Sequence, residues 1–467
     1  MMGNETICAL ATAPGGALGI IRVSGPQAFD AVSAICAIRC DAVGANTTHY
    51  ARIVDHDAAS QHQTVIDETL VTVFRAPHSY TGEDSVEISC HGSRYILNKV
   101  LELLVQHGCR MANPGEYTMR AYLNGKLDLS QAEAVADLIA STNQATHQMA
   151  MSQLRGGIST ELSRLREQLL KLTSLLELEL DFSDHEDLEF ADRSELLSVA
   201  KNIDIHGTRL AKSFETGQAI KQGIPVAIVG KTNVGKSTLL NRLLKDDRAI
   251  VSDIHGTTRD TIEDTIDING ITFRFIDTAG IRQTTDTIEQ IGIDRTYAAI
   301  AKARIVIWMV DEEPSQEELA KMESFSENKQ LIIARNKIDK AESKPFTLAN
   351  IPLIEISAKH NQNIDQLEQA IYQAADIPVL SDTDIVVTNA RHHDALVRAQ
   401  GHLHRVIEGM GAKMVNGQWS MVNESLSGDL LSEDLRLTLD TLSEITGGQI
   451  TPNEVLGNIF KNFCVGK

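Results

Sequence analysis

The stretch Gly230–Leu244, "GKTNVGKSTLLNRLL", follows the apolar run "IPVAIVG" and leads into a helical pattern. It fits the motif G-x-x-x-x-G-K-[ST], with Gly230, Gly235, Lys236 and Ser237 at the defining positions. Glycines let backbone N–H groups turn inward to cradle phosphate oxygens, and the following helix adds the positive end of its dipole. We expect Lys236 to reach the β- and γ-phosphates of a nucleotide and Ser237 to ligate Mg²⁺. The plain alternative is a glycine turn between a strand and a helix.

Two downstream motifs favour the nucleotide. "FRFIDTAG" runs from an apolar strand into Asp277, whose carboxylate can hold the Mg²⁺ shell, and the N–H of Gly280 can sense the γ-phosphate. "GTTRD" lies where a switch loop belongs, and its Thr258 is a candidate second Mg²⁺ ligand. Many GTPases place Gln directly after D-x-x-G to orient the attacking water. Here that position is Ile281, so another residue must do this, and Glu289 is a candidate by position, although it also reads as an ordinary exposed acid.

Two more motifs indicate the base. "LIIARNKID" places Asn336, Lys337 and Asp339 after a buried strand, and "LIEISAK" places Ser357–Lys359 after another. A carboxylate at Asp339 can accept two N–H bonds from guanine, which adenine does not offer in that pattern. The motifs follow the order found in small GTPases. Alternating strand and helix patterns over about residues 224–375 predict a mostly parallel sheet, with nucleotide at the carboxyl ends of its strands.

Composition bounds the remaining possibilities. At 467 residues with 42% hydrophobic content, the chain has room for two or three domains. Its 43 basic and 63 acidic residues give a net charge of −20, so an RNA substrate would need a basic partner or a local basic patch. No run of 18 apolar residues and no signal or transit pattern is present, and we expect a cytoplasmic protein. The six scattered cysteines, including Cys36 and Cys40 at a helical spacing, favour buried free thiols over a metal site.

The patterns predict a multidomain α/β and α chain, made of an N-terminal α+β domain, a helical bundle domain and an inserted Ras-like P-loop GTPase domain. Residues 1–125 contain the strands "LGIIRVSG", "ETLVTVFRAP" and "DSVEISCHG" and the helix "YILNKVLELLVQHG". We expect the first helical part at 126–220, the GTPase domain at 221–378 and the second helical part at 379–467. Insertion is easy where the two ends of a domain lie close together.

Two features of the helical parts lead to specific expectations. Ser130 and Glu133 fit a capping box. An apolar stripe of leucines at spacings of three and four predicts a long bundle helix, at positions Leu162, Leu165, Leu169, Leu172 and Leu176. Four histidines of the second part have spacings that do not gather with a carboxylate on one helix face, so we expect surface histidines and not a metal site, at His392, His393, His402 and His404.

Three signatures outside the GTPase motifs resemble the MnmE family of tRNA modification GTPases, also called TrmE. They are "TICALATAPGGALGIIRVSG" with "SYTGEDSVEISCHG", then "NPGEYTMRAYLNGKLDLSQAEAVADLI", and finally "IFKNFCVGK" with its C-x-G-K ending. The resemblance covers essentially the whole chain. Two residues depart from the family pattern. Thr232 stands where this family commonly has Pro, a difference of little consequence for the loop. Gly448 stands where the family commonly has an acid, so the resemblance supports contacts near the C-terminus less strongly.

The resemblance implies that the N-terminal domain dimerises and binds a tetrahydrofolate derivative of the 5,10-methylene or 5-formyl type as one-carbon donor. The folate-binding residues it implies are Arg22, Glu87, Lys126 and Lys467. Cys464 corresponds to the family's C-terminal cysteine. It is either a thiolate nucleophile that adds to a uridine ring or a structural cysteine that shapes the folate pocket.

For the GTPase domain, the resemblance implies that K⁺ takes the place of an arginine finger. Asn233 would ligate K⁺ together with oxygens of Ser252, Ile254 and Thr257. Glu289 would orient the water or act as general base, and Arg282 would help to shape the switch. The implied GTP-binding residues are Asn233, Val234, Gly235, Lys236, Ser237, Thr238, Ser252, Asp253, Ile254, His255, Gly256, Thr257, Thr258, Asp277, Thr278, Ala279, Gly280, Asn336, Lys337, Asp339, Ser357, Ala358 and Lys359.

The function these expectations favour is a K⁺-activated, Mg²⁺-dependent, dimeric GTPase. With an FAD-containing partner of the MnmG (GidA) type, in a heterotetramer, it would install an aminomethyl-type or carboxymethylaminomethyl group at C5 of the wobble uridine of certain tRNAs. One alternative is a regulatory or ribosome-assembly GTPase with no part in modification. Another is a scaffold with degenerate hydrolysis.

Overall fold

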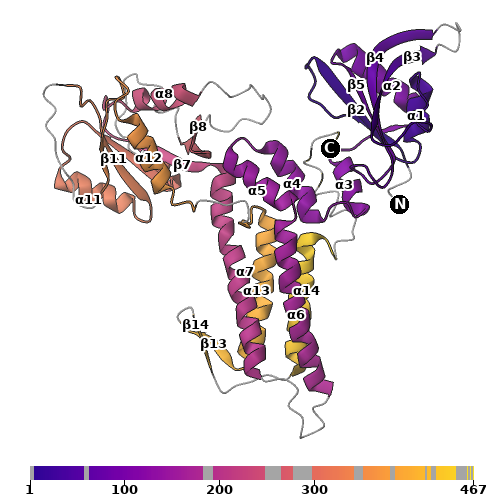
Figure 1. The fold of residues 1–467 in the computed structure, drawn as a ribbon. Helices are drawn as coiled ribbons and strands as arrows, with labels where there is room; N and C mark the ends of the chain where they lie inside the picture. Colours follow the sequence, from indigo (N-terminus) through magenta and orange to yellow (C-terminus); the bar gives the residue numbers. More distant parts are fainter. Residues whose placement is uncertain are drawn as a thin grey trace. The chain divides into compact units, whose positions relative to one another are not determined.

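The computed structural model describes residues 5–56, 63–181, 193–247, 264–276, 297–340, 351–378, 384–415, 418–421, 428–448, 460, 463 and 466. The chain divides into two compact units, each described below by itself (Figure 1). Unit 1 comprises Met1–Ala140, Ala150–Arg209 and Arg391–Lys467, and unit 2 comprises Ser141–Met149 and Leu210–Ala390. Among the described residues, no helix is both long enough and apolar enough to span a membrane.

Unit 1 begins with a six-stranded sheet in the order β3-β4-β5-β2-β1-β6. All neighbours pair antiparallel except β1 and β6, which are parallel. The elements of this region are β1 (Ile7–Leu10), β2 (Leu18–Ser24), α1 (Ala28–Ile35), β3 (Thr47–His56), β4 (Gln63–Phe74), β5 (Ser85–His91), α2 (Arg94–Gln106), β6 (Arg110–Met111) and α3 (Glu116–Leu123).

The two faces of this sheet differ because side chains alternate along a strand. Ile21 and Val23 of β2 and Val86 and Ile88 of β5 join one core with α1 and α2. The residues between them, which include Arg22 and Glu87, therefore lie on the opposite face. Gly108 follows α2 with φ +92°, where a left-handed backbone ends the helix as the sequence predicts.

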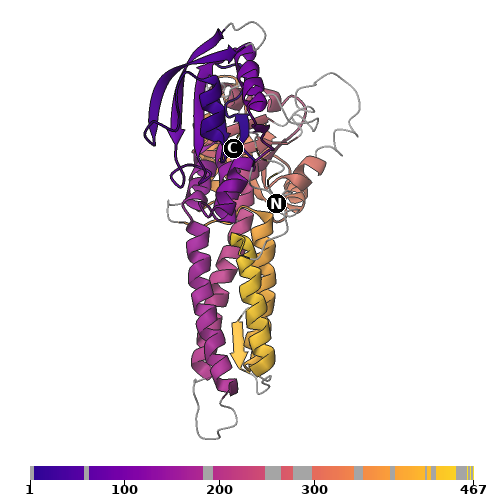
Figure 2. The same cartoon turned by 90° about the vertical axis from the view of Figure 1, so that its right-hand side faces the viewer.

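The helical part of unit 1 is a bundle of long helices that lie side by side in Figures 1 and 2. These long helices are α6 (Gly157–Asp181), α7 (Arg193–Gln222), α13 (Ala390–Gly409) and α14 (Gly428–Thr446). The shorter helices α4 (Leu129–Ala140) and α5 (Gln144–Leu154) come before them in the sequence, and a hairpin of β13 (Ala412–Val415) and β14 (Gln418–Met421) follows α13. The first part of α5, up to Met149, and the last part of α7, from Leu210, belong to unit 2. The leucine stripe is confirmed, because all five of its residues are buried in α6.

The predicted capping box of α4 is wrong by two residues. Asp128 precedes the helix, its Oδ1 accepts the N–H of Gln131 at 2.9 Å, and Gln131 Oε1 accepts the N–H of Asp128 at 3.0 Å. Ser130 and Glu133 lie inside the helix and are buried. Glu133 is instead held by side chains from α13, which the local pattern does not reveal.

Unit 2 holds a second six-stranded sheet, in the order β12-β11-β10-β7-β9-β8, in which only β8 runs antiparallel to its neighbour. The mostly parallel sheet and the P-loop position confirm the predicted fold class. Its elements are β7 (Ile224–Val229), α8 (Lys236–Asp247), β8 (Asp264–Ile268), β9 (Ile271–Phe275), β10 (Ile305–Val310), α11 (Gln316–Phe325), β11 (Gln330–Arg335), β12 (Leu353–Glu355) and α12 (Ile364–Ala374).

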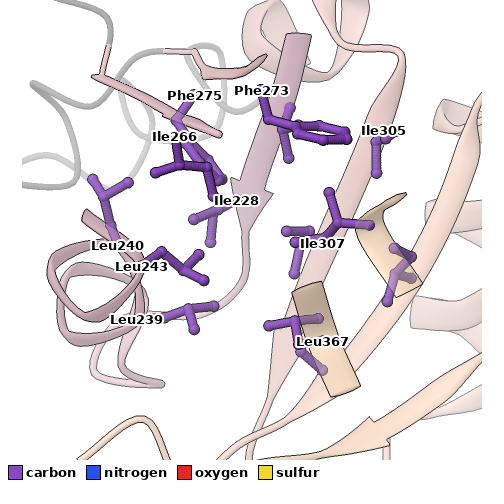
Figure 3. Close-up of a cluster of buried hydrophobic side chains, with 14 of the residues drawn as sticks. Ile228, Leu239, Leu240, Leu243, Ile266, Phe273, Phe275, Ile305, Ile307 and Leu367 are labelled. Carbon is purple, nitrogen blue, oxygen red and sulfur yellow. The ribbon is translucent and has the colours of Figure 1, made fainter. Parts of the chain in front are cut away.

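Helices cover both faces of this sheet. Ile305 and Ile307 of β10 pack with α8 and α12, and Figure 3 shows them with Leu239, Leu243 and Leu367. The alternate residues of β10, Val306 and Trp308, pack on the other face with the helix over residues 297–302 and with α11. Burial on both faces explains the continuous apolar runs that mark these strands in the sequence.

The two connections that lead into and out of unit 2 touch each other. Ser213 Oγ accepts the N–H of Val387 at 3.0 Å, and Gln218 Nε2 donates to the carbonyl of Thr388 at 2.7 Å. A Cβ at Gly217 would lie 2.3 Å from the carbonyl oxygen of Val387. Only glycine therefore permits this approach, which joins the end of α7 to the segment that returns to α13.

Candidate functional site

The loop between β7 and α8 has the backbone of a phosphate cradle. Gly230 and Gly235 have φ of +149° and +103°, and Asn233 is left-handed at +62°. A Cβ at Gly230 would lie 2.3 Å from the carbonyl oxygen of Met309, so no side chain fits there. Lys236 Nζ donates to the carbonyls of Gly230 and Lys231 at 2.7 and 2.8 Å. Burial lowers the pKa of Lys236, because the charged ammonium loses hydration.

Asn336 joins this loop to the predicted base-recognition loop. The residue is 4% exposed. Its Nδ2 donates to the carbonyl of Val234 at 2.7 Å, and its Oδ1 accepts the N–H of Ala358 at 3.0 Å. A Cβ at Gly235 would lie 2.3 Å from the same Nδ2, so this glycine is needed for the contact. One amide therefore fixes three predicted motifs relative to one another.

Asp339 and Ser357 lie together beside Asn336. Ser357 Oγ donates to Asp339 Oδ1 at 2.7 Å, and this hydrogen bond holds the pKa of the exposed carboxyl below its usual value. A carboxylate that is ionised and oriented can accept N–H groups from a ligand. Lys337, with φ +67°, donates from Nζ to Asp311 Oδ2 at 2.7 Å. Lys359 is exposed and follows Ala358 in the same loop.

The structure thus brings together the described part of the predicted GTP site at the carboxyl ends of β7, β11 and β12. Ser237 and Thr238 lie in the first turn of α8. The remaining predicted residues lie outside the described residues, and these are Ser252, Asp253, Ile254, His255, Gly256, Thr257, Thr258, Asp277, Thr278, Ala279, Gly280, Arg282, Glu289, Cys464 and Lys467.

A second group lies in unit 1, on the sheet face opposite α1 and α2. Arg22 and Glu87 are directly opposite in the β2–β5 register, and Arg22 Nε and Nη2 donate to Glu87 Oε1 at 2.9 and 2.7 Å. The guanidinium lies over the rings of Tyr80 and Tyr117, at 5.4 and 5.6 Å from their centroids. Arg22 Nη1 also donates to the carbonyl of Gly466 at 3.2 Å.

Lys126 is tied to the same neighbourhood by the loop over residues 77–82. Its Nζ donates to the carbonyl of Pro77 at 2.9 Å, while Tyr80 of that loop contacts Arg22. Tyr80 Oη is within 2.8 Å of Thr118 Oγ1, and burial raises the pKa of Tyr80. Arg22 therefore gathers one carboxylate and two aromatic rings around it, and the loop that carries Tyr80 also holds a second cationic group, Lys126. This donor set suits a planar, polar ring with an anionic tail.

The expectation of surface histidines is wrong for His392, which is buried. Its Nε2 lies 2.7 Å from Glu133 Oε2, and Arg391 donates to both oxygens of the same carboxylate at 3.0 Å. His402 and His404 are half-buried and face different carboxylates. Among the described residues, no three metal-ligating side chains gather into a group. The five described cysteines are buried free thiols, as predicted.

Sequence reasoning did not find Asp311, Tyr80, Tyr117 or Gly466. Asp311 carried a usable signal, since a carboxylate directly after the apolar strand β10 matches the pattern of the other site residues. The two tyrosines carried none, because their rings meet Arg22 only through tertiary structure.

Comparison with known proteins identifies the family. The model of the MnmE helical domain matches residues 129–464, and the model of the GTP-binding protein TrmE N-terminus matches residues 6–126. The chain belongs to the MnmE (TrmE) family of tRNA modification GTPases. Two relatives named tRNA modification GTPase MnmE align along their full length and that of this chain. They come from Phocaeicola vulgatus, at 51% identity, and Bacteroides thetaiotaomicron, at 52%.

Among solved structures, Era from Aquifex aeolicus bound to GDP·AlF₄⁻ is 25% identical to this MnmE-family chain. It covers 38% of this chain and 65% of its own, with a TM-score of 0.25, a value too low to add to the fold assignment.

Proposed function

We propose that this MnmE-family chain is a cytoplasmic, K⁺-activated and Mg²⁺-dependent GTPase that acts as a dimer in tRNA modification. With an FAD-containing MnmG-type partner, forming a heterotetramer, it takes part in adding an aminomethyl or carboxymethylaminomethyl group at C5 of wobble uridine in certain tRNAs. A tetrahydrofolate derivative supplies the carbon. The observation that carries the nucleotide part is Asn336, which ties the phosphate loop to the base loop.

Binding of GTP follows from groups already in place. Lys236 exchanges its two carbonyl partners for phosphate oxygens, and the phosphate charge offsets the burial that lowers its pKa. Asp339, kept ionised by Ser357, accepts the guanine N–H groups. The N–H groups of the glycine-rich loop would surround the phosphates and stabilise charge that develops during transfer.

One described residue supports each of the two proposed metal ions. Ser237 opens α8 beside the phosphate cradle, where its hydroxyl would hold Mg²⁺ together with Thr258. Asn233 is exposed in a left-handed turn of the loop and would hold K⁺, with Ser252, Ile254 and Thr257 as the further ligands. A bound cation there supplies positive charge to the transferred phosphoryl group, a role that is worth roughly 10³–10⁵ in rate when an arginine finger performs it. Glu289 positions the water in place of the absent glutamine, and Arg282 shapes the switch.

The Arg22 group supports a folate site. Arg22 and Lys126 would meet carboxylate or carbonyl groups, Glu87 would accept N–H bonds from a pterin edge, and Lys467 would complete the set. Tyr80 and Tyr117 would pack against the ring. Cys464 is left with both roles that the sequence allows, a nucleophile or a wall of this pocket. The net charge of −20 supports a partner that provides the basic tRNA-binding face.

GTP turnover by the full-length chain, measured in K⁺ and in Na⁺ buffers of equal ionic strength, tests this proposal. Faster turnover in K⁺, lost in the Asn233→Ala variant, supports the cation mechanism. Equal turnover in both salts refutes it and leaves the GTPase intact. If neither salt supports turnover above that of a Lys236→Ala control, the GTPase assignment itself is wrong.

A further inference from the structure

The segment Ser141–Met149 lies between α4 and the rest of α5 in the sequence, but it packs as part of unit 2. The segment packs against the hairpin of β8 and β9, and we call this contact its seat. Asn143 Nδ2 donates to Thr272 Oγ1 at 2.7 Å, and the N–H of Ala145 donates to the carbonyl of Gly270 at 3.1 Å. The segment therefore adds both a side-chain and a backbone hydrogen bond to one side of the hairpin.

The chemistry of this seat is specific. The Asn143 side chain serves two elements at once, because its Oδ1 also caps α5 by accepting the N–H of Thr146 at 2.8 Å. Gly270 has φ +80°, and a Cβ there would lie 3.1 Å from the Cβ of Gln144. A larger residue at the hairpin turn would push the segment away.

A cavity of about 190 Å³ lies beside the seat. On one side the cavity is lined by residues of the segment and of the hairpin turn, namely Gln144, Ala145 and Gly270. On the other side it is lined by Ile220 of α7, Tyr372 of α12 and Pro378. A segment that borders unfilled space meets less resistance to a shift than one enclosed in a close-packed interior.

The hairpin also occupies a particular place in the sequence. β8 starts at Asp264, four residues after Asp260 of the "GTTRD" switch motif, and β9 ends at Phe275, two residues before Asp277. It therefore connects the two segments predicted to sense the γ-phosphate. In the sequence, Ser141–Met149 directly follows α4, which begins at Leu129, three residues after the predicted folate residue Lys126.

We propose that Ser141–Met149 is a coupling segment, which transmits the nucleotide state from the β8–β9 hairpin to α4 through the Asn143–Thr272 and Ala145–Gly270 contacts. The inference rests on the proposed GTPase function. Asn143 and Thr272 are positioning residues, because they act through the hairpin and touch no substrate.

Hydrogen exchange of the full-length protein tests the coupling. The amide of Ala145 is followed without nucleotide, with GDP and with a non-hydrolysable GTP analogue, both with Mg²⁺. Thr272→Val removes the oxygen that Asn143 contacts and keeps the shape of the side chain. Thr265→Val is the matched control, because it makes the same substitution at an exposed position on β8 of the same hairpin.

We expect the exchange rate of the Ala145 amide to differ several-fold between the GDP and GTP-analogue states in the wild type and in Thr265→Val. In Thr272→Val the difference should vanish although nucleotide affinity, measured in parallel, stays unchanged. The coupling is overturned if the wild type binds both nucleotides and shows equal exchange, or if Thr272→Val keeps the difference. A wild type that binds no guanine nucleotide overturns the proposed function as well.

Discussion

Replacing Asn336 by Ala should destabilise unit 2, because it removes the side chain that joins two nucleotide-binding loops. The carbonyl of Val234 and the N–H of Ala358 each lose this partner in a buried position. An unsatisfied buried group costs about 1–3 kcal/mol, and water entering the vacated space offsets part of that cost. We therefore expect a loss of about 2–3 kcal/mol, which lowers the melting temperature of a unit this size by about 4–12 °C.

Calorimetry of the full-length protein measures this loss, and the shift caused by added GDP identifies the transition of unit 2. Asn336→Asp should fall between wild type and Asn336→Ala, because it keeps the acceptor for Ala358 and turns a carboxylate toward the Val234 carbonyl. Gln373→Ala, an exposed amide on α12, is the control and should change little. A transition of Asn336→Ala within about 1 °C of wild type would refute the reasoning.

Three further outcomes are expected. Burial alone would raise the pKa of Glu133, but hydrogen bonds from His392 and Arg391 lower it below the usual 4.5. The stability that this carboxylate contributes is therefore fully present above pH 4.5, and it is lost as the pH falls through the lowered pKa of the folded protein. Glu133→Gln should flatten this acid dependence in urea unfolding and, by leaving Arg391 uncompensated, cost about 3–5 kcal/mol at pH 7, whereas an unchanged midpoint would contradict the role of the cluster. Asp339→Asn should weaken GTP binding by roughly 10–100-fold in titration calorimetry while binding of xanthosine triphosphate improves, because an amide matches the xanthine carbonyl. Arg22→Ala should abolish binding of 5-formyltetrahydrofolate in equilibrium dialysis, and Arg22→Lys, which keeps the charge without the fork, should restore only part of it; equal binding by all three proteins would exclude Arg22 from the site.

Patterns set by burial were readable from the sequence. The leucines of α6 and the apolar runs of β7, β10 and β11 report which side chains leave water, and the structure confirms them. The glycine-rich loop was equally readable, because its spacing reflects backbone conformations that few residues other than glycine adopt.

Features that depend on distant partners were not readable. Glu133 has the spacing of a capping residue, yet it lies buried against Arg391 and His392, more than 250 residues away. The error at His392 has the same cause, because its buried partner Glu133 lies far away in the sequence and the helical spacing gives no sign of it. The packing of Ser141–Met149 with unit 2 also had no local signal in the sequence, because it depends on a hydrogen bond from Asn143 to Thr272 of β9, more than 100 residues away.

The contact between Ser213 and Val387 and the close approach at Gly217 have a practical consequence for engineering. The end of α7 and the segment around Val387 contact each other, so the part of the chain between Gly217 and Val387 starts and ends at neighbouring positions in space. A foreign domain whose N- and C-termini lie close together could replace this part of the chain. A domain with distant termini would separate α7 from the segment around Val387. Candidate domains for insertion at this position should therefore be ranked first by the distance between their N- and C-termini.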